Sequence, residues 1–319
     1  MSKDILLKKI NFRSSEGILL LVVIFLCIVL SLISDRFLTA DNAVNIIRQM
    51  SFNGILAIGM AFVIIGAGID LSVGAIAAFT GVIFGFLSTT YNIPWGIALI
   101  AALMAGTLLG ALNGVISAYL KIPSFIVTLG VQSLLRGVAM ITTDGSPISR
   151  LNEGFIFIGM GSFLGVPIPI IIFVSLFIIA WICLNKTKLG RYVYASGDNS
   201  EAASVSGINV KRVSMITFAI SGFMAAVFGL VQSARLMTVP PNLGIGAEMD
   251  AIAAVCVGGV SLYGGGGSLI GVLIGVAMMS IIRNGLTMLG ISVWWQQVIV
   301  GAILIIAVFF STRSSKSRG

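Results

Sequence analysis

The chain has 319 residues, of which 58% are hydrophobic and 9% charged, and its mean hydropathy is +1.11. A water-soluble protein carries about 25% charged residues, so this composition excludes a soluble globular protein and favours one embedded in lipid. The net charge is +8, but the basic residues lie in short segments between apolar runs and at the ends. This distribution predicts membrane orientation and no nucleic-acid binding.

Ten apolar segments follow one another along the chain, and crossing a bilayer takes about 20 residues at ~1.5 Å each. No small-x-small cleavage site follows the first, so we expect a retained span rather than a signal peptide. The eighth is short and is either a half-helix or part of a re-entrant turn. The segments cover residues 17–34, 44–67, 75–91, 94–120, 124–142, 167–184, 213–235, 251–263, 268–289 and 293–311.

The sequence therefore predicts an all-α, polytopic transmembrane protein of about ten spans, within a range of eight to eleven. Residues 1–319 form one membrane domain, of which about 14–312 are embedded. Small residues at helical spacing, such as Gly106, Gly110 and Gly114, predict close helix packing.

Lysine and arginine are distributed unequally between the two sides of the ten-span arrangement. With the N-terminus inside, 13 of the 19 fall in inside segments, and the outside segments receive only Arg36, Arg48 and Arg150. Because cytoplasmic loops carry the excess of positive charge, both termini and the loop 185–212 are expected in the cytoplasm. The outside loop 143–166 has room for a partner protein to dock.

Histidine is absent, and the three cysteines (Cys27, Cys183 and Cys256) lie in apolar runs without metal-ligand spacing. We interpret them as small hydrophobic residues and expect no metal site. The stretch Gly264–Gly267 is followed by Ser268 and has no lysine after it, so it lacks the pattern of a phosphate-binding loop and is interpreted as a tight turn. The sequence predicts no ATPase site and no enzyme.

The inside loop 185–212 is the longest polar stretch of the chain and contains the signals of a short helix. Asn199 or Ser200 is a good N-cap, and Glu201 in the first turn suits the helix dipole. Gly207 is a natural helix stop. A helix of under two turns is unstable by itself, so we expect another part of the system to hold it.

Ala202 and Ala203 give this helix a small face that suits a groove on another protein. With Glu201 and Gly207 they form the pattern Glu-Ala-Ala-x-x-x-Gly. It resembles the signature of the coupling helix in bacterial ABC importer permeases, and this resemblance implies that the helix docks in a cleft of the cytoplasmic ATPase.

Further stretches resemble one branch of those permeases, the ribose-type sugar group (carbohydrate uptake group 2). The similarity runs from about Leu38 to Phe310, with the motifs in the same order. They are GIDLSVG at 68–74, LLRG at 134–137, DGSP at 144–147, LGRY at 189–192, SGINV at 206–210 and EMDAIAAV at 248–255.

The resemblance implies the membrane-spanning subunit of an ATP-driven importer in the bacterial inner membrane. Its partners, besides membrane lipid, would be a cytoplasmic ABC ATPase with two fused nucleotide-binding domains, a periplasmic sugar-binding protein and a second permease chain, identical or homologous. ATP and Mg would bind to the ATPase, and this chain would bind no cofactor. The substrate would be a monosaccharide, such as a ribose-like pentose, a hexose or a related sugar. Purine nucleosides remain an alternative.

Asp70 lies in an otherwise apolar stretch, where a carboxylate costs several kcal/mol at membrane depth. One interpretation is a broken helix whose turn lines the translocation path, with Asn53 and Ser72 as further polar lining. The other is a loop near the inner face, where Asp70 caps the third span. The sequence leaves both open.

Three arginines fall in or at the ends of spans, and arginine there needs a partner or access to headgroups. We expect Arg136 to belong to the path or its gate. Arg235 is expected near the outer face with Glu248 and Asp250, as a polar rim of the outer mouth or as structural ion pairs. Arg283 is the third.

A stand-alone secondary transporter or channel is the competing function. It would need its own ionisable coupling group deep in the membrane, and Asp70 is the one acidic candidate in a long apolar stretch. Such a transporter would have no reason to keep a short Ala-rich helix in an inside loop.

Overall fold

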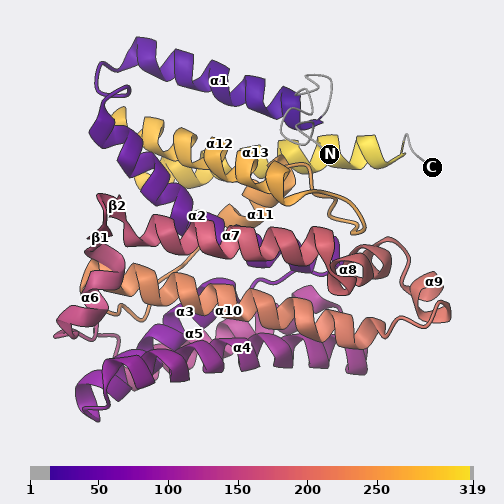
Figure 1. Cartoon of the computed structure of the whole chain (residues 1–319), viewed down its shortest axis with the longest axis horizontal. Helices are drawn as coiled ribbons and strands as arrows, with labels where there is room; N and C mark the ends of the chain where they lie inside the picture. Colours follow the sequence, from indigo (N-terminus) through magenta and orange to yellow (C-terminus); the bar gives the residue numbers. More distant parts are fainter. Residues whose placement is uncertain (1–14, 317–319) are drawn as a thin grey trace, which may run out of the picture.

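Across residues 15–316, a computed structural model of the chain holds thirteen α-helices, one short π-helical segment and one two-stranded hairpin (Figure 1). The elements are α1 (Ser15–Ile33), α2 (Ala40–Ile65), α3 (Val73–Gly85), η1 (Phe86–Thr90), α4 (Trp95–Leu120), α5 (Ser124–Thr142), α6 (Glu153–Met160), β1 (Ser162–Phe163), β2 (Val166–Pro167), α7 (Ile168–Lys186), α8 (Lys188–Asp198), α9 (Ser200–Val205), α10 (Val210–Leu236), α11 (Ala247–Val257), α12 (Leu269–Met288) and α13 (Val293–Lys316).

Eight of the described helices are long and apolar enough to cross a membrane: α1, α2, α3 continued by η1, α4, α5, α7, α10 and α12. Each corresponds to one of the ten predicted segments, with ends that differ by a few residues. The predicted all-α class is therefore confirmed, apart from the hairpin of two residues per strand.

The other two predicted segments are shorter or reach the edge of the described chain. The eighth is α11, whose 11 residues extend about 16 Å, half the thickness of a bilayer core. This length fits a half-helix, and the choice between a half-helix and a re-entrant turn stays a prediction. The apolar part found in α13 covers Val293–Ile306, so a count of ten spans stays a prediction.

The central helix is α10, which has 27 residues and is about 40 Å long. Its most extensive contact is with α4, followed by α2 and α3. At the crossing with α4, Gly222 lies against Gly106 and Gly110, and a Cβ on any of the three would clash with backbone of the other helix. Small residues thus let the two helices approach closely, as predicted.

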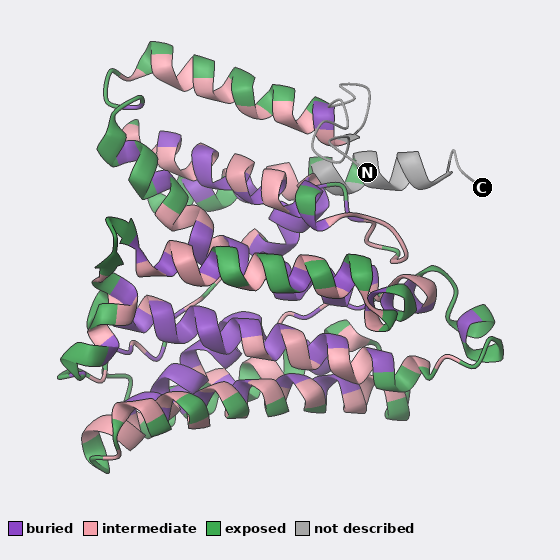
Figure 2. Cartoon of the chain, viewed as in Figure 1, coloured by how far each residue is buried: buried purple, intermediate pink, exposed green. Residues whose placement is uncertain are grey.

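The buried core follows the inner part of α2 and the middle of α10 (Figure 2). In α2, nearly every side chain from Phe52 to Ile65 is buried, whatever face of the helix it lies on. Such a helix must be surrounded by others on all sides. In contrast, α1 is mostly exposed and packs mainly against α12.

The helices lie roughly side by side, so the bundle has two ends (Figure 1). At one end lie α8 and α9, together with the beginning of α1 at Ser15 and the end of α13. At the other end lie α6, the β1–β2 hairpin and the segment between α1 and α2. The sequence did not predict α6 or the hairpin within the loop 143–166, nor α8 within the loop 185–212.

The α4–α10 contact leads to a stability prediction. We expect Gly222→Val to lower the thermal midpoint of the detergent-solubilised protein by several degrees, because overpacking costs about 1–3 kcal/mol or more. The control is Gly130→Val on α5, where an added Cβ meets no atom within 4 Å. Equal midpoints for the two variants would contradict the close α4–α10 packing.

Candidate functional site

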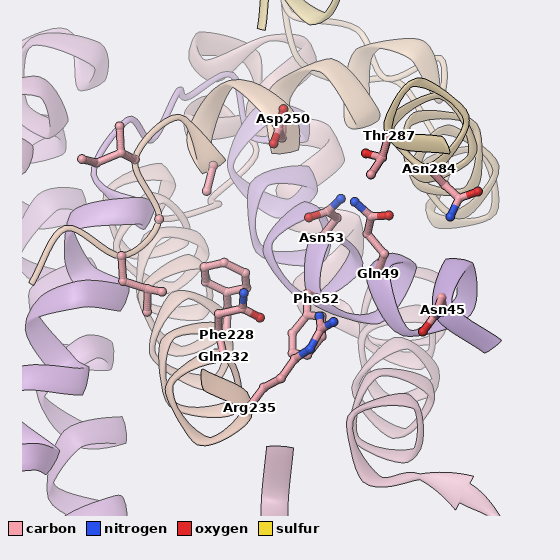
Figure 3. A pocket seen from close by; sticks show the side chains of 14 residues that line it. Asn45, Gln49, Phe52, Asn53, Phe228, Gln232, Arg235, Asp250, Asn284 and Thr287 are labelled. Carbon is pink, nitrogen blue, oxygen red and sulfur yellow. The ribbon is translucent and has the colours of Figure 1, made fainter. Parts of the chain in front are cut away.

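A cavity of about 430 Å³ opens between α2, α10, α11 and α12 (Figure 3). It lies toward the end of the bundle opposite α8 and α9, because it is lined by the first half of α2 and the last turns of α10 and α12. Its polar lining consists of Asn45, Gln49, Asn53, Gln232, Arg235, Asp250, Asn284 and Thr287.

One face of α2 supplies an amide stripe to this cavity. Asn45, Gln49 and Asn53 recur every four residues and therefore lie on the same side of the helix. Gln49 and Asn53 point into the space that faces Asn284 and Thr287 of α12 (Figure 3). The cavity is thus lined by neutral groups that can both donate and accept hydrogen bonds.

The two charged lining residues differ in how they are compensated. Asp250 of α11 forms a salt bridge with Arg283 of α12. Arg235 of α10 has no carboxylate within ion-pair distance in the described part of the chain, and its guanidinium lies over the ring of Phe52 at 5.0 Å from the centroid. Such cation–π contacts stabilise an arginine that lacks an acidic partner.

Asp70 lies elsewhere, in the break between α2 and α3, and its side chain is completely buried. One carboxylate oxygen accepts hydrogen bonds from the backbone N–H and hydroxyl of Ser72, at 3.0 and 2.6 Å. The other accepts one from Ser221 of α10 at 2.8 Å. Asn113 of α4 donates to the Ser72 hydroxyl. The network joins three helices at the break.

Asp70 and Ser72 do not line the cavity. Asp70 accepts the N–H and the hydroxyl of Ser72, the residue that precedes α3, and no side-chain hydrogen bond caps that helix. The segment is a break buried within the bundle, and both interpretations of Asp70 stay predictions. Of the four residues expected along the path, only Asn53 faces the cavity.

Arg136 of α5 donates to the carbonyl oxygens of Pro241 and Leu243, at 2.9 and 2.8 Å. It thereby holds the loop that precedes α11. Glu248 in the first turn of α11 is buried and accepts a hydrogen bond from Gln132 of α5 at 3.2 Å. Arg136 and Gln132 of α5 thus hold α11 and the loop before it, outside the cavity lining.

Of the three residues expected at the outer rim, two line the cavity and one does not. Arg235 and Asp250 both line the cavity, whereas Glu248 lies behind it, and the ion pair of this region is Asp250 with Arg283. Sequence reasoning missed Asn45, Gln49, Gln232, Asn284 and Thr287. The four-residue spacing in α2 was a usable signal, because amides rarely share one face of a span.

The short helix expected in the loop 185–212 is α9, preceded by α8. Its N-cap is Asn199, whose side chain accepts a hydrogen bond from the N–H of Ala202 at 2.9 Å. Gly207 follows with a φ of +84°, a helix stop that favours glycine. Ala203 is buried against its own chain at 5% exposure, so only Ala202 is exposed of the two alanines.

The most exposed large apolar side chain here is Val205, at the end of α9, with 90% of its surface accessible. Figure 1 shows α9 as the outermost element of its end of the bundle. An aliphatic side chain in that position is not covered by any described element and is suited to contact a partner protein.

A three-way junction connects α8 to the rest of the bundle. The carbonyl oxygen of Ile65, at the end of α2, accepts the N–H of Gly265 at 2.9 Å. Gly197 of α8 packs so closely on the same carbonyl that a Cβ would clash. The hydroxyl of Tyr194 donates to the carbonyl of Gly267 at 2.9 Å. Burial raises the pKa of Tyr194, so the phenol stays a donor at neutral pH.

Among residues 15–316, no three side chains of histidine, cysteine, aspartate or glutamate gather closely enough to hold a metal ion. The cysteines within that range are unpaired thiols. The polar groups that line the cavity are amides, one hydroxyl, the Arg235 guanidinium and the Asp250 carboxylate, which can form reversible hydrogen bonds with a ligand.

Comparison with known proteins gives a consistent result. Residues 42–308 match a family described as branched-chain amino acid transport system, permease component. The chain is 43% identical to the ribose import permease of Haemophilus influenzae, with 90% of each chain covered. It is 33% identical to the xylose transport system permease of the same organism (97% and 99% covered). It is 35% identical to the D-allose transport system permease of Escherichia coli (96% and 94% covered). No solved structure matched.

The Asp70 network leads to a second stability prediction. We expect Asp70→Ala to lower the free energy of unfolding in detergent by about 1–3 kcal/mol for each buried donor left without a partner. Asp35→Ala, at an exposed position between α1 and α2, serves as the matched control. If both variants unfold at the wild-type temperature, the network does not hold the break together.

Proposed function

The chain belongs to this permease family as a multi-pass membrane protein, and we propose that it forms the transmembrane path of an ATP-driven importer of a monosaccharide. Two ends of the bundle have distinct roles in this proposal. The end that carries α8 and α9 faces the cytoplasm, together with both termini, and the end where the cavity lies faces outward. The positive-inside distribution of lysine and arginine supports this orientation.

The observation that carries the proposal is the form of α9. It is a helix of under two turns at the tip of one end of the bundle, with Ala202 and Val205 exposed. A helix this short gains little stability from its own backbone, and its exposed apolar face has the size and shape of a segment that inserts into a groove. We assign Glu201, Ala202, Ala203 and Gly207 to contact or support of the ATPase, with Ala203 anchoring α9 to its own chain.

A monosaccharide fits best as the substrate. The matched family is named for branched-chain amino acids, but the relatives described above are permeases for ribose, xylose and D-allose. The neutral amides of the cavity are suited to hydroxyl groups. An amino acid would bring two opposite charges, for which the cavity offers only Arg235 without an acidic partner.

Three protein partners follow from the proposal. An ABC ATPase with two fused nucleotide-binding domains would bind at α9 and hold ATP and Mg, since the resemblance implies that this chain supplies neither cofactor site. A periplasmic sugar-binding protein would dock on α6, the β1–β2 hairpin and the neighbouring loops. A second permease chain, identical or homologous, would complete the assembly in the bacterial inner membrane.

The junction at Ile65 offers a route from the ATPase to the cavity. Movement of α9 displaces α8, and α8 is packed on the Ile65 carbonyl and the loop 264–267. That loop leads directly into α12, while α2 carries the amide stripe. The two cavity walls are therefore mechanically connected to the docking helix, as a two-state transport cycle requires.

Ala202→Arg tests the docking role. We expect the variant to insert and fold, because Ala202 is exposed, but to lose ATP-dependent sugar uptake by about tenfold or more, because a long charged side chain blocks insertion into a groove. Uptake of labelled D-ribose, D-xylose and D-allose is measured in proteoliposomes with the co-purified ATPase and binding protein.

The matched control is Asn185→Arg, which adds the same charge at an exposed position of α7 at the same end of the bundle. It should retain wild-type uptake. Normal uptake by the Ala202→Arg variant would refute the docking role. Uptake by the wild-type chain alone, driven by an ion gradient without ATPase, would instead support a secondary transporter.

Tyr194→Phe tests the junction. The ring is kept and only the hydrogen bond to Gly267 is lost, so we expect assembly and ATP hydrolysis to persist. The number of sugar molecules imported per ATP should fall about 2- to 10-fold, since one hydrogen bond contributes roughly 0.5–1.5 kcal/mol. Tyr192→Phe, two residues away and 40% exposed, should behave as wild type. An unchanged transport ratio for Tyr194→Phe would exclude this bond from the route.

A further inference from the structure

We propose that the cavity between α2, α10, α11 and α12 is a transit site that holds one neutral monosaccharide within a single permease chain. The inference rests on the proposed import function and adds to it a location, a ligand class and a stoichiometry of one site per chain. The path is then not formed solely where two chains meet.

The first argument is the chemistry of the lining. A monosaccharide carries a hydroxyl on almost every carbon, and each hydroxyl both donates and accepts. The primary amides of Gln49 and Asn53 present both kinds of group to the cavity (Figure 3), while the amide of Asn284 on the opposite side is paired with Asn42 of α2, at 2.8 and 3.2 Å. Polar side chains inside a membrane bundle are costly and tend to mark substrate pathways. Their concentration on one cavity therefore indicates a hydroxylated ligand.

The second argument is an unused hydrogen-bonding group. The side-chain oxygen of Gln232 is buried and accepts no hydrogen bond from any described residue. A buried acceptor without a donor is unfavourable. Gln232 lies one turn before Arg235 on the cavity wall, so a small rotation of its amide would let a ligand hydroxyl satisfy it.

The third argument is charge. Asp250 is neutralised by Arg283, and the guanidinium of Arg235 has one face covered by Phe52. What remains exposed of Arg235 is its planar set of N–H donors, which can bind the oxygens of a neutral sugar. Six of the eight polar lining residues are uncharged, so the lining is suited to a ligand that binds mainly through hydrogen bonds.

The fourth argument is size and position. A volume of 430 Å³ lies near the lower end of the ~300–1,000 Å³ found for small-molecule sites, which suits one small ligand with some water. Asn45 lies near the outer end of α2 and Asn53 near its middle, beyond which the helix is buried in apolar contacts. The cavity thus extends from the outer end to the middle of the bundle.

Paired substitutions test the site by transport in the assembled complex. Asn53→Leu and Gln232→Leu remove hydrogen-bonding groups at nearly constant volume, and Asn185→Leu changes an exposed amide far from the cavity. We expect the two cavity variants to lower the maximal rate of D-ribose, D-xylose or D-allose import about 10-fold. The sugar concentration at half-maximal uptake should not change, because the binding protein captures the sugar. Wild-type rates in both cavity variants would overturn the proposal.

Ligand occupancy is tested directly by protection from labelling, a readout that does not require transport. Cys27, Cys183 and Cys256 are replaced by alanine, and Thr287→Cys places a thiol at an exposed position of the cavity wall. We expect millimolar D-ribose, D-xylose or D-allose to slow its reaction with a membrane-impermeant maleimide at least about threefold.

The outcomes are distinct. Protection by ribose 5-phosphate alone would overturn the neutral class, and absence of protection by any sugar would overturn the site. If the wild-type complex imports sugar but labelling is insensitive to it, the transit site fails while the import function stands. If the wild-type complex imports no sugar with ATP, the proposed function fails, and labelling still decides the site separately.

Discussion

The buried carboxylate of Asp70 fixes the point at which α2 ends and α3 begins, and the arrangement of the bundle depends on that point. Inside a membrane, backbone groups freed by a break must find partners within the protein. Asp70 takes the N–H of Ser72 and reaches α10 through Ser221, while Ser124 and Thr128 of α5 accept N–H groups of the same segment. The break is thereby attached to α5 and α10, so its depth in the bundle is set.

The two halves of α2 therefore lie in different surroundings, one polar and one apolar. From Asn45 to Asn53 the helix presents amides to the cavity, and from Ile55 to Ile65 it is surrounded by apolar side chains. A hydrated sugar cannot pass the second half without replacing its hydrogen bonds, because buried polar groups need partners. The cavity lining on α2 ends at Asn53, so the cavity does not reach the end of the bundle that carries α8 and α9.

Helix positions could be predicted from the sequence because each span must be apolar over its whole length, a signal that survives any packing arrangement. The role of α11 was left open because a short apolar segment of 11 residues fits a half-helix and part of a re-entrant turn equally well. The cavity could not be predicted, since it combines four helices whose neighbours depend on tertiary packing. A charged residue such as Asp70 is conspicuous in an apolar sequence, although it does not line the cavity. The uncharged Gln49 and Asn284 do line it, but amides are less conspicuous in a sequence. The amphipathic α8 could not be predicted from the polar loop, because clear cap and stop signals were present only for α9.

The helix α2 connects the end of the bundle that carries α8 and α9 with the cavity. Its last carbonyl, at Ile65, is bound to Gly265 and covered by Gly197 of α8, so a displaced α8 acts on α2 directly. A continuous hydrogen-bonded helix transmits such a push along its axis, unless it bends where side chains are smallest. Gly54 and Gly59 are such places, and both pack closely on neighbouring helices, at Phe173 and Met224. Access to the cavity can therefore change either by a shift of the whole amide stripe or by bending at these glycines. In both cases the amides of α2 move relative to Asn284 and Thr287 of α12, and a sugar held between the two walls would lose its hydrogen bonds on one side first.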